Sequence, residues 1–312
     1  MNNHDDVLYL FLHIPKTGGI TFLRHVKYNY ASKTLLAVGP KPDMKFNHCA
    51  EVDAYINSLP QKRKDQVRFV SGHSVYHGIH GHFQKKPRYF TFLRDPVKRT
   101  ISNFNYFMQN YDVFVQEDNE LFPQNRDELT FDRWWDCFQH NLQTGVVLNY
   151  RHDDKPGWDP ELRLDESHLE EAKRILDDFY FVGLTETFQE DSMFLYGKLG
   201  ITSFFKERQN VMSRSFVTVT DDVKKRIAKD AALDIELYEH AIDLNRRFKI
   251  EHERFTAIVR QTESDRKFVT PLRFIAADAV RAVLGIRRTQ ILVAWVSKTV
   301  QATLKILGVR RG

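Results

Sequence analysis

Short apolar runs alternate with amphipathic stretches along the first two thirds of the chain. Four apolar runs have the length of buried strands and each precedes a polar or glycine-containing turn: 7–14, 67–72, 88–94 and 179–184. Apolar residues recur at helical spacing in the stretches that follow them, notably 19–29, 96–109, 131–142, 167–178 and 188–199. This order predicts an α/β fold with a central parallel sheet covered by helices on both faces.

The rest of the chain is predicted to divide into a helical end and an insertion. After residue 220 the pattern is helical, with at least one long helix over 221–260 and two amphipathic stretches within 266–312. The earlier segment 110–165 is rich in Asp, Asn, Pro and aromatic residues, which indicates an insertion over one edge of the sheet. We therefore predict a main domain at 1–262 and a helical tail at 266–312.

Length and cysteine content limit the class of protein. A chain of 312 residues can hold one large α/β domain and an appendage. The two cysteines, Cys49 and Cys137, lack CxxC spacing, which excludes a disulfide framework and favours a reducing compartment. Residues 1–6 contain no Lys or Arg and the apolar run after them is short, so we expect no secretory signal or N-terminal anchor and a cytoplasmic location.

The positive charge is concentrated in the tail. The whole chain carries a formal charge of +5, whereas 266–312 contain ten basic residues and one acidic residue, a net charge of +9. Lys298 and Lys305 interrupt the second amphipathic stretch, so it is not a membrane span. Two basic amphipathic helices favour binding to an anionic membrane surface, and the alternative is a helical hairpin packed on the main domain or on a second subunit.

The first apolar run leads directly into a strand–turn–helix motif, His13-Ile14-Pro15-Lys16-Thr17-Gly18-Gly19-Ile20-Thr21. Gly18 and Gly19 can turn several backbone N–H groups toward one point, and the N-terminus of the following helix adds partial positive charge there. Lys16 supplies a full positive charge, and Thr17 and Thr21 supply hydroxyl donors. The turn therefore predicts a site for phosphate or an isosteric anion.

The order of residues in this turn excludes two familiar motifs. The Walker A loop, G-x-x-x-x-G-K-[ST], has its lysine after the glycines, whereas Lys16 precedes them. The Lys-Thr-Gly box of serine β-lactamases requires an upstream Ser-x-x-Lys, which is absent before Lys16.

A second basic motif follows the third apolar run. Pro96 stands where a first helical position is expected, and Asp95 is placed to cap that helix. Arg99 and Ser102 are one helical turn apart and share a face near the helix start, close to Arg94 at the end of the strand. This cluster predicts a second anion site, and a structural role for Arg94 and Asp95 as an ion pair beside the cap is the alternative.

Together the two motifs resemble those of sulfotransferases that use 3′-phosphoadenosine 5′-phosphosulfate (PAPS), in particular the carbohydrate branch, such as the heparan and chondroitin sulfotransferases. In that family a [HIQR]-x-P/Q-K-T-G-x-[ST] turn holds the 5′-phosphosulfate and an R-D-P-x-x-R-x-x-S segment holds the 3′-phosphate. Weaker resemblances occur at 181–186, similar to the family's G-L-T-E turn, and at 233–238, similar to its L-D-x-x-L-Y helix. The resemblance covers residues 7–250.

This resemblance implies a P-loop-like three-layer fold, PAPS as sulfuryl donor and a set of donor-binding residues: Lys16, Thr17, Gly18, Gly19 and Thr21 at the 5′ end, Arg94 and Ser102 at the 3′ end. Lys16 is also expected to stabilise the leaving group. No metal is predicted, because a sulfuryl group carries less charge than a phosphoryl group. The animal enzymes of this branch are Golgi membrane proteins, so the expected lack of an anchor suggests a bacterial or otherwise cytoplasmic relative.

The acceptor hydroxyl must lose its proton to a base with a pKa near neutrality. His73 follows the predicted strand 67–72 at the same edge of the sheet as both anion sites, and it resembles the catalytic histidine of heparan sulfate 2-O-sulfotransferase. His73 is our candidate base, and His77 is the second choice, because 6-O-sulfotransferases place theirs a few residues later. A zinc cluster of His73, His77, His80 and His82, or a surface loop that is merely rich in histidine, are the alternatives.

The acceptor is predicted from the resemblance alone to be a carbohydrate or glycolipid, with no nucleic-acid partner. Trp134, Trp135 and Trp158 lie in the predicted insertion, where their rings could stack on sugars, although the first two could equally be the core of an amphipathic helix. A membrane-binding tail would place the enzyme at the inner membrane surface, near a lipid-linked acceptor.

Two other functions remain open from the sequence. A P-loop-like phosphotransferase or nucleotide hydrolase would show magnesium-dependent turnover of ATP or GTP. A non-catalytic polyanion-binding protein would bind sulfated or phosphorylated polymers in a salt-sensitive way without turnover.

Overall fold

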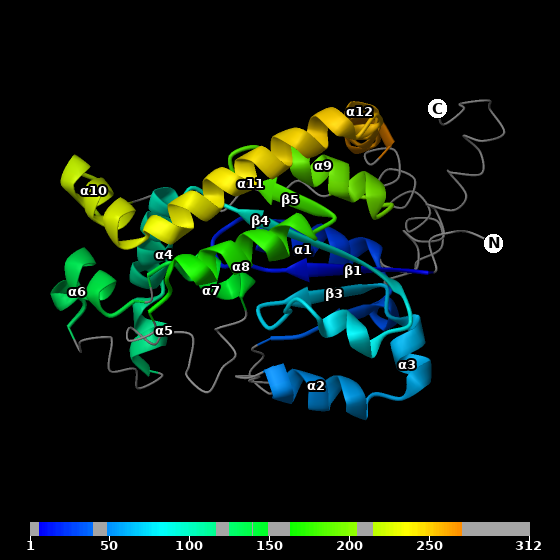
Figure 1. The fold of residues 1–312 in the computed structure, drawn as a ribbon, viewed down its shortest axis with the longest axis horizontal. Coiled ribbons are helices and arrows are strands. Elements are labelled where there is room, and N and C mark those ends of the chain that lie inside the picture. Colours follow the sequence, from blue (N-terminus) through cyan, green and yellow to red (C-terminus); the bar gives the residue numbers. More distant parts are fainter. Residues whose placement is uncertain are drawn as a thin grey trace, which may run out of the picture. The chain divides into compact units, whose positions relative to one another are not determined.

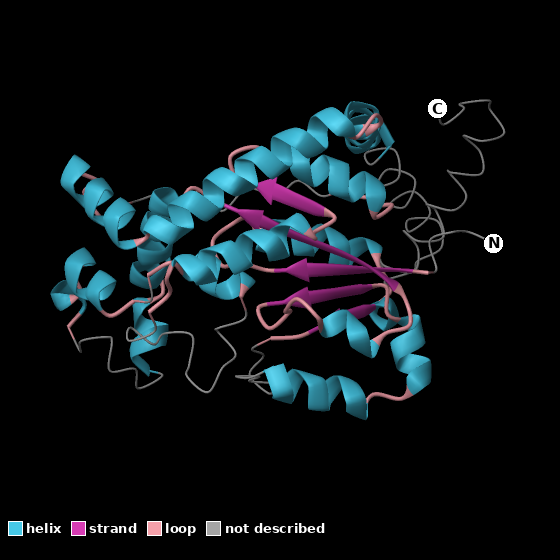
Figure 2. Cartoon of the chain, viewed as in Figure 1, coloured by secondary structure: helices cyan, strands magenta, loops and turns pink. Residues whose placement is uncertain are grey.

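The computed structural model describes residues 6–39, 49–116, 125–138, 140–148, 163–204 and 215–269. Within them, five parallel strands form one sheet in the order β2-β3-β1-β4-β5 (Figure 1, Figure 2). The strands are β1 (Val7–Leu12), β2 (Leu35–Ala37), β3 (Phe69–Gly72), β4 (Lys86–Leu93) and β5 (Phe181–Leu184). The predicted α/β fold with a central parallel sheet is confirmed.

Helices follow most of the strands and make up most of the described residues after β5. They are α1 (Gly19–Asn29), α2 (Cys49–Ser58), α3 (Gln61–Gln66), α4 (Pro96–Gln109), α5 (Tyr111–Gln116), α6 (Phe131–Asp136), α7 (Leu142–Val147), α8 (Glu166–Asp177), α9 (Phe188–Lys198), α10 (Asp221–Asp230), α11 (Ala232–Glu251) and α12 (Phe255–Ser264). Shorter turns of helix occur at Ser32–Thr34, Ile79–His82, Arg126–Glu128 and Asp265–Val269. The expected helical C-terminal region is therefore present.

The central strand β1 is buried on both faces, which explains its continuous apolar sequence. On one face Leu8, Leu10 and Leu12 join an aliphatic core to which α2, α8 and α11 contribute. On the other face the ring of Phe11 lies 5.4 Å from that of Phe22 in α1. The sheet is thus the middle layer of three, as the sequence predicts.

Two helices that position the candidate site begin and end where the sequence predicts them, namely α1 and α4. The cap of α4 is also as predicted, because the Asp95 carboxylate accepts a hydrogen bond from the Lys98 backbone N–H at 2.8 Å and Pro96 is the first helical residue. The predicted helix over 131–142 is wrong. The chain forms α6 instead, which ends at Asp136, and then α7, whose N-cap Asn141 has a left-handed backbone (φ 56°).

The contacts divide the chain into two compact units, one of residues 1–191 and 208–252 and the other of residues 192–207 and 253–312. All strands and all predicted site residues belong to the first unit. In the second unit the rings of Phe194 and Phe255 stack with their centroids 4.8 Å apart. The predicted tail 266–312 lies outside the described residues except for its first four, so the division after residue 262 stays a prediction. Within the described ranges, none of the helices combines the length and apolar character that crossing a bilayer requires.

Candidate active site

The turn between β1 and α1 leaves the N-terminus of α1 open to an anion. Gly18 is the N-cap of α1, no side chain caps this helix end, and its first turn contains no acidic residue. The first N–H groups of a helix have no acceptor within the helix, and they attract negative charge. Gly18 has a φ of +89°, and a Cβ on Gly19 would lie 2.2 Å from the ring of His13, so both glycines are needed for this path.

Side chains from neighbouring strands hold the carbonyl groups of this turn. The Arg94 guanidinium, after β4, donates from Nη1 to the Lys16 carbonyl at 3.2 Å. The Thr185 hydroxyl, after β5, donates to the Thr17 carbonyl at 3.0 Å. Because these carbonyls are fixed toward the protein, the shape of the turn is set before a ligand binds.

The Thr17 hydroxyl, predicted as a donor to an anion, instead donates to the backbone of the turn. The residue is fully buried, and its hydroxyl donates to the Ile14 carbonyl at 2.8 Å. Any contact of Thr17 with an anion would therefore come from its backbone N–H. Thr21 lies in the first turn of α1 and is half-buried, which leaves its hydroxyl near the open helix end.

The Lys16 side chain lies among other cationic and aromatic groups. Its backbone is left-handed, with a φ of 70°, which is uncommon for a residue other than glycine. Burial, and then the positive charge of Arg94, lower the pKa of the Lys16 ammonium to about 8. Its Nζ lies 4.2 Å from the centroid of the Tyr106 ring. The negative charge of a bound anion would oppose both effects on the pKa and favour the charged ammonium.

Two arginines beside the turn carry buried nitrogen atoms without a partner among the described residues. These atoms are Nε of Arg94, and Nε and Nη1 of Arg99. Burial lowers the pKa of both guanidinium groups, and the negative charge of Asp234 opposes this effect at Arg99. Buried donors without acceptors are costly, so several of them side by side are suited to binding an anion. Ser102 lies one turn beyond Arg99 on α4 and is half-buried.

A buried network supports these arginines from behind. Asp234 of α11 accepts hydrogen bonds from the backbone N–H groups of Gln143 at 3.1 Å and Thr144 at 2.8 Å, and so fixes the start of α7. The Gln143 side chain then pairs with the backbone of Arg94, accepting from its N–H at 3.0 Å and donating to its carbonyl at 2.9 Å. Helix α11 thus positions Arg94 through α7.

His73 lies at the carboxyl end of β3, next to the end of β1. Its Nδ1 is 3.0 Å from the His13 carbonyl, and the two rings stack with centroids 4.3 Å apart. A carbonyl only accepts, so Nδ1 carries the proton and the lone pair of the neutral ring is on Nε2. The tautomer needed for a general base is therefore fixed by the backbone of the strand that leads into the anion-binding turn.

Comparison with known proteins decides the family. A model of the Sulfotransferase family matches residues 2–246. This chain is a member of the sulfotransferase family. In this sulfotransferase the two basic clusters at the ends of two neighbouring strands, β1 and β4, are in direct contact through Arg94 and Lys16.

Similar proteins place this sulfotransferase near enzymes that act on a carbohydrate. It is 27% identical over 292 residues to heparan-sulfate 6-O-sulfotransferase 1-B of Danio rerio, covering 80% of this chain and 68% of that protein. It is 23% identical over 271 residues to heparan sulfate 2-O-sulfotransferase 1 of Mus musculus, covering 78% of this chain and 72% of that protein. Both similarities extend beyond the two short motifs.

The other histidines of the loop after β3 lie away from the anion-binding turn of this sulfotransferase. The His77 ring contacts Tyr89, in the first half of β4, and Phe179, just before β5, and burial lowers the pKa of His77. His80 is hydrogen-bonded through Nδ1 to the Tyr89 hydroxyl at 2.9 Å, and His82 pairs with Asp53. In the part of the chain that the structure describes, no cluster of three or more potential metal ligands forms. Geometry therefore favours His73 over His77.

The tryptophans of the predicted insertion are core residues where the structure describes them. Trp134 and Trp135 are 2% and 1% exposed and pack with Phe104, Phe131 and their neighbours. Their proposed stacking on a sugar is wrong, because their rings are already covered. Trp158 lies outside the described residues.

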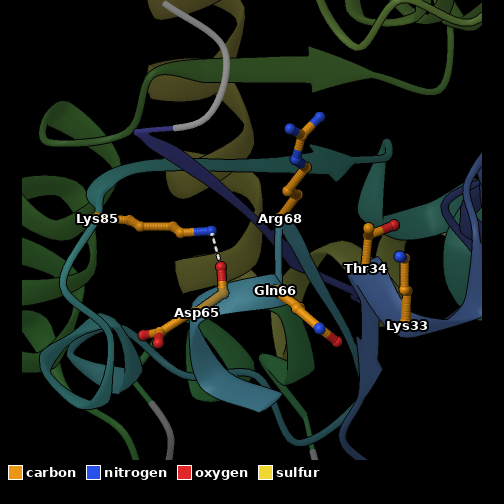
Figure 3. Close-up of a pocket in the computed structure, with 6 residues that line it drawn as sticks. All are labelled: Lys33, Thr34, Asp65, Gln66, Arg68 and Lys85. Carbon is orange, nitrogen blue, oxygen red and sulfur yellow. Dashed lines mark hydrogen bonds between the residues drawn. The ribbon is translucent and has the colours of Figure 1, made fainter. Parts of the chain in front are cut away.

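A basic cavity of about 260 Å³ lies at the opposite edge of the sheet. It is lined by the six residues drawn in Figure 3, namely Lys33, Thr34, Asp65, Gln66, Arg68 and Lys85. Thr34, Arg68 and Lys85 directly precede β2, β3 and β4, so the cavity is at the amino ends of the strands. The Lys85 ammonium donates to the carbonyls of Asp65 at 2.7 Å and Val67 at 2.8 Å. The cavity is therefore separate from the site around Lys16.

Sequence reasoning missed several residues that support the site. Asp234 lies within the motif similar to the L-D-x-x-L-Y helix, and Thr185 lies within the motif similar to the G-L-T-E turn. Both motifs marked these positions in the sequence but did not indicate which contacts the residues make. Gln143 and Tyr106 gave no signal, because a lone glutamine or tyrosine on an amphipathic helix is common. Their roles depend on contacts between segments far apart in the sequence.

Proposed function

We propose that this enzyme transfers a sulfuryl group from PAPS to a hydroxyl of a carbohydrate or glycolipid. The observation that carries the proposal is the contact between the two basic clusters, where Arg94 donates to the Lys16 carbonyl at 3.2 Å. Clusters this close can bind the two phosphorylated ends of one adenosine nucleotide. The motifs that resemble the family's 5′ and 3′ binding segments support the same donor.

The residues present fit the donor. The uncapped end of α1 offers N–H groups to the 5′-phosphosulfate, together with Lys16, Gly18, Gly19 and Thr21. The unpartnered buried nitrogen atoms of Arg94 and Arg99, with the Ser102 hydroxyl beside them, suit the 3′-phosphate. When bound, PAPS supplies a sulfuryl group whose bond to the 5′-phosphate breaks as the acceptor oxygen bonds to sulfur.

In the proposed mechanism His73 and Lys16 act on opposite sides of the transferred group. His73 takes the proton of the acceptor hydroxyl on Nε2, while Nδ1 keeps its hydrogen bond to the His13 carbonyl. The Lys16 ammonium and the N–H groups of the turn stabilise the negative charge that develops on the leaving phosphate. These groups are fixed before the reaction, so little reorganisation is required.

The acceptor class is proposed from the names of the relatives, which describe sulfotransferases of heparan sulfate. This chain is 27% and 23% identical to them, so the proposal names a carbohydrate or glycolipid hydroxyl and no particular sugar position.

The test is a transfer assay with purified full-length protein, PAPS and a panel of glycans and glycolipids. We expect PAPS-dependent formation of a sulfated product without added metal ion, measured by mass spectrometry, with Lys16→Ala as the inactive control. Turnover of ATP or GTP with magnesium, and none of PAPS, would contradict the proposal.

The tail at 266–312 gives a second part to the proposal, namely that the enzyme is cytoplasmic and binds the inner membrane surface. Its support is the net charge of +9 and the amphipathic spacing in the sequence. Full-length protein should sediment with anionic liposomes, and a variant without 266–312 should not. Equal sedimentation of both proteins would refute this role of the tail.

A further inference from the structure

The ammonium of Lys16 lies against the ring of Tyr106, a residue that has no part in the proposed mechanism. Tyr106 lies on α4, four residues after Ser102, so the two side chains share a face of that helix. The Tyr106 ring centroid is 4.2 Å from Nζ of Lys16. Tyr106 is 39% exposed, which is unusual among the aromatic residues that the structure describes. An exposed ring over a functional cation requires an explanation.

Among the described groups around the Lys16 ammonium, Arg94 repels it and the Tyr106 ring attracts it. Arg94, from the segment after β4, is the charged group that acts on Lys16, and it repels the ammonium. Within the described part of the chain, no carboxylate or carbonyl accepts a hydrogen bond from Nζ. The negative face of an aromatic ring attracts a cation, and this attraction grows as the cation loses water.

We propose that Tyr106 is a positioning residue, whose ring holds the Lys16 side chain in its charged form beside α4 until the donor's 5′ group takes over the ammonium. The inference rests on the proposed function only for the identity of that donor. The resting contact belongs to the protein itself. Because Lys16 is half-buried next to Arg94, loss of the ring would favour the neutral amine.

The proposal distinguishes the ring from the hydroxyl of Tyr106. Tyr106→Phe keeps the π face and should behave as the native protein. Tyr106→Leu removes the face and, above pH ~8, should raise the KM for PAPS by roughly 3- to 10-fold with little change in kcat, because the bound donor itself holds the ammonium in its charged form. Tyr106→Met serves as a second non-aromatic variant in case the leucine variant is unstable.

The decisive experiment measures the protonation of Lys16 without any donor. Full-length protein is labelled with trace acetic anhydride across a pH series, and acetylation of Lys16 is followed by mass spectrometry, with Lys85 as the control in the same sample. We expect the midpoint for Lys16 to move to lower pH by about half to one pH unit in Tyr106→Leu and to stay in place in Tyr106→Phe.

An unchanged Lys16 midpoint in both non-aromatic variants would overturn the proposal, and so would an equal shift in the phenylalanine variant. If the native protein transfers no sulfuryl group from PAPS, the proposed function fails, but the labelling result still decides the role of Tyr106. The two failures are therefore distinguishable.

Discussion

Both edges of the sheet are rich in basic side chains, and they use them differently. At the amino edge, Lys85 donates to two backbone carbonyls and Arg63 donates to the carbonyls of Lys33 and Leu35. At the carboxyl edge, Arg99 keeps two buried nitrogen atoms without a partner in the described residues, and Lys16 lies against a ring. The first set binds backbone carbonyls, whereas the second set keeps donors that our proposed function assigns to an anion.

A cavity in this protein is a weaker guide to a binding site than buried donors without acceptors are. The cavity of about 260 Å³ is at the amino edge, where the basic groups of Lys85 and Arg63 already have acceptors. The carboxyl edge is marked by an uncapped helix end and by three buried guanidinium nitrogen atoms, of Arg94 and Arg99, that have no acceptor among the described residues. Each unsatisfied donor raises the free energy of the ligand-free protein. A ligand that accepts its hydrogen bond removes this cost.

The largest effect on activity is expected when His73, the proposed base, is replaced. Replacing His73 by Ala should lower kcat by ~100- to 10,000-fold, because the acceptor hydroxyl loses its proton acceptor. His77→Gln, in the same loop but beside Tyr89, should retain most of the activity. Steady-state sulfuryl transfer measures both, and a greater loss in the His77 variant would contradict the assignment.

The next largest effect on activity is expected at Lys16, and a lysine at the amino edge, Lys85, serves for comparison. Lys16→Ala should lower kcat by ~100-fold or more, since the leaving group loses its electrostatic stabilisation. Lys85→Ala should leave kcat near the native value and lower the free energy of unfolding by about 1.5–3 kcal/mol per lost charged hydrogen bond. Transfer assays and urea unfolding measure the pair. Similar losses of activity would show that the two edges do not differ as described.

A third prediction concerns the support behind the carboxyl edge. Asp234→Ala should destabilise the protein by ~3–5 kcal/mol, because the buried Arg99 guanidinium loses its compensating charge and α7 loses its acceptor. Urea unfolding measures this loss. Asp243→Ala, on the exposed face of the same helix, is the control and should change stability by less than about 1 kcal/mol. Equal effects would refute the network.

The smallest effect is a change in protonation. The pKa of Lys16 is lowered to about 8, and a bound anion favours its charged form. When 3′-phosphoadenosine 5′-phosphate binds above that pH, Lys16 should therefore take up a proton. Titration calorimetry at pH ~8.5 in two buffers with different ionisation enthalpies should show an uptake of roughly half a proton or more. Lys16→Ala should show none, and equal uptake by that variant would assign the proton to another group.

The sequence predicted the parts of the site that depend on local order along the chain. The glycine turn, the start of α4 and its Asp95 cap each follow from residues within one strand–helix junction. The four longer strands were predicted because a buried parallel strand requires a continuous apolar run. The three-residue strand β2 was missed, because so short a run does not differ from a loop.

What the sequence could not predict depends on packing between distant segments. Trp134 and Trp135 were open to two interpretations, and only their burial against α4 decides for the core. Gln143 lies 49 residues from Arg94 in the chain, and its pairing with that backbone requires α7 to be held by Asp234. No pattern within α7 indicates this contact.

The most direct test of the account is titration calorimetry of the full-length enzyme with 3′-phosphoadenosine 5′-phosphate, adenosine 5′-phosphate, adenosine 3′-phosphate and ATP. The account predicts that the bisphosphate binds at least ~10-fold more tightly than either monophosphate or ATP, because each end loses charged hydrogen bonds when its phosphate is absent. Equal affinity for a monophosphate, or tighter binding of ATP, would contradict a single site that joins Lys16 to Arg94.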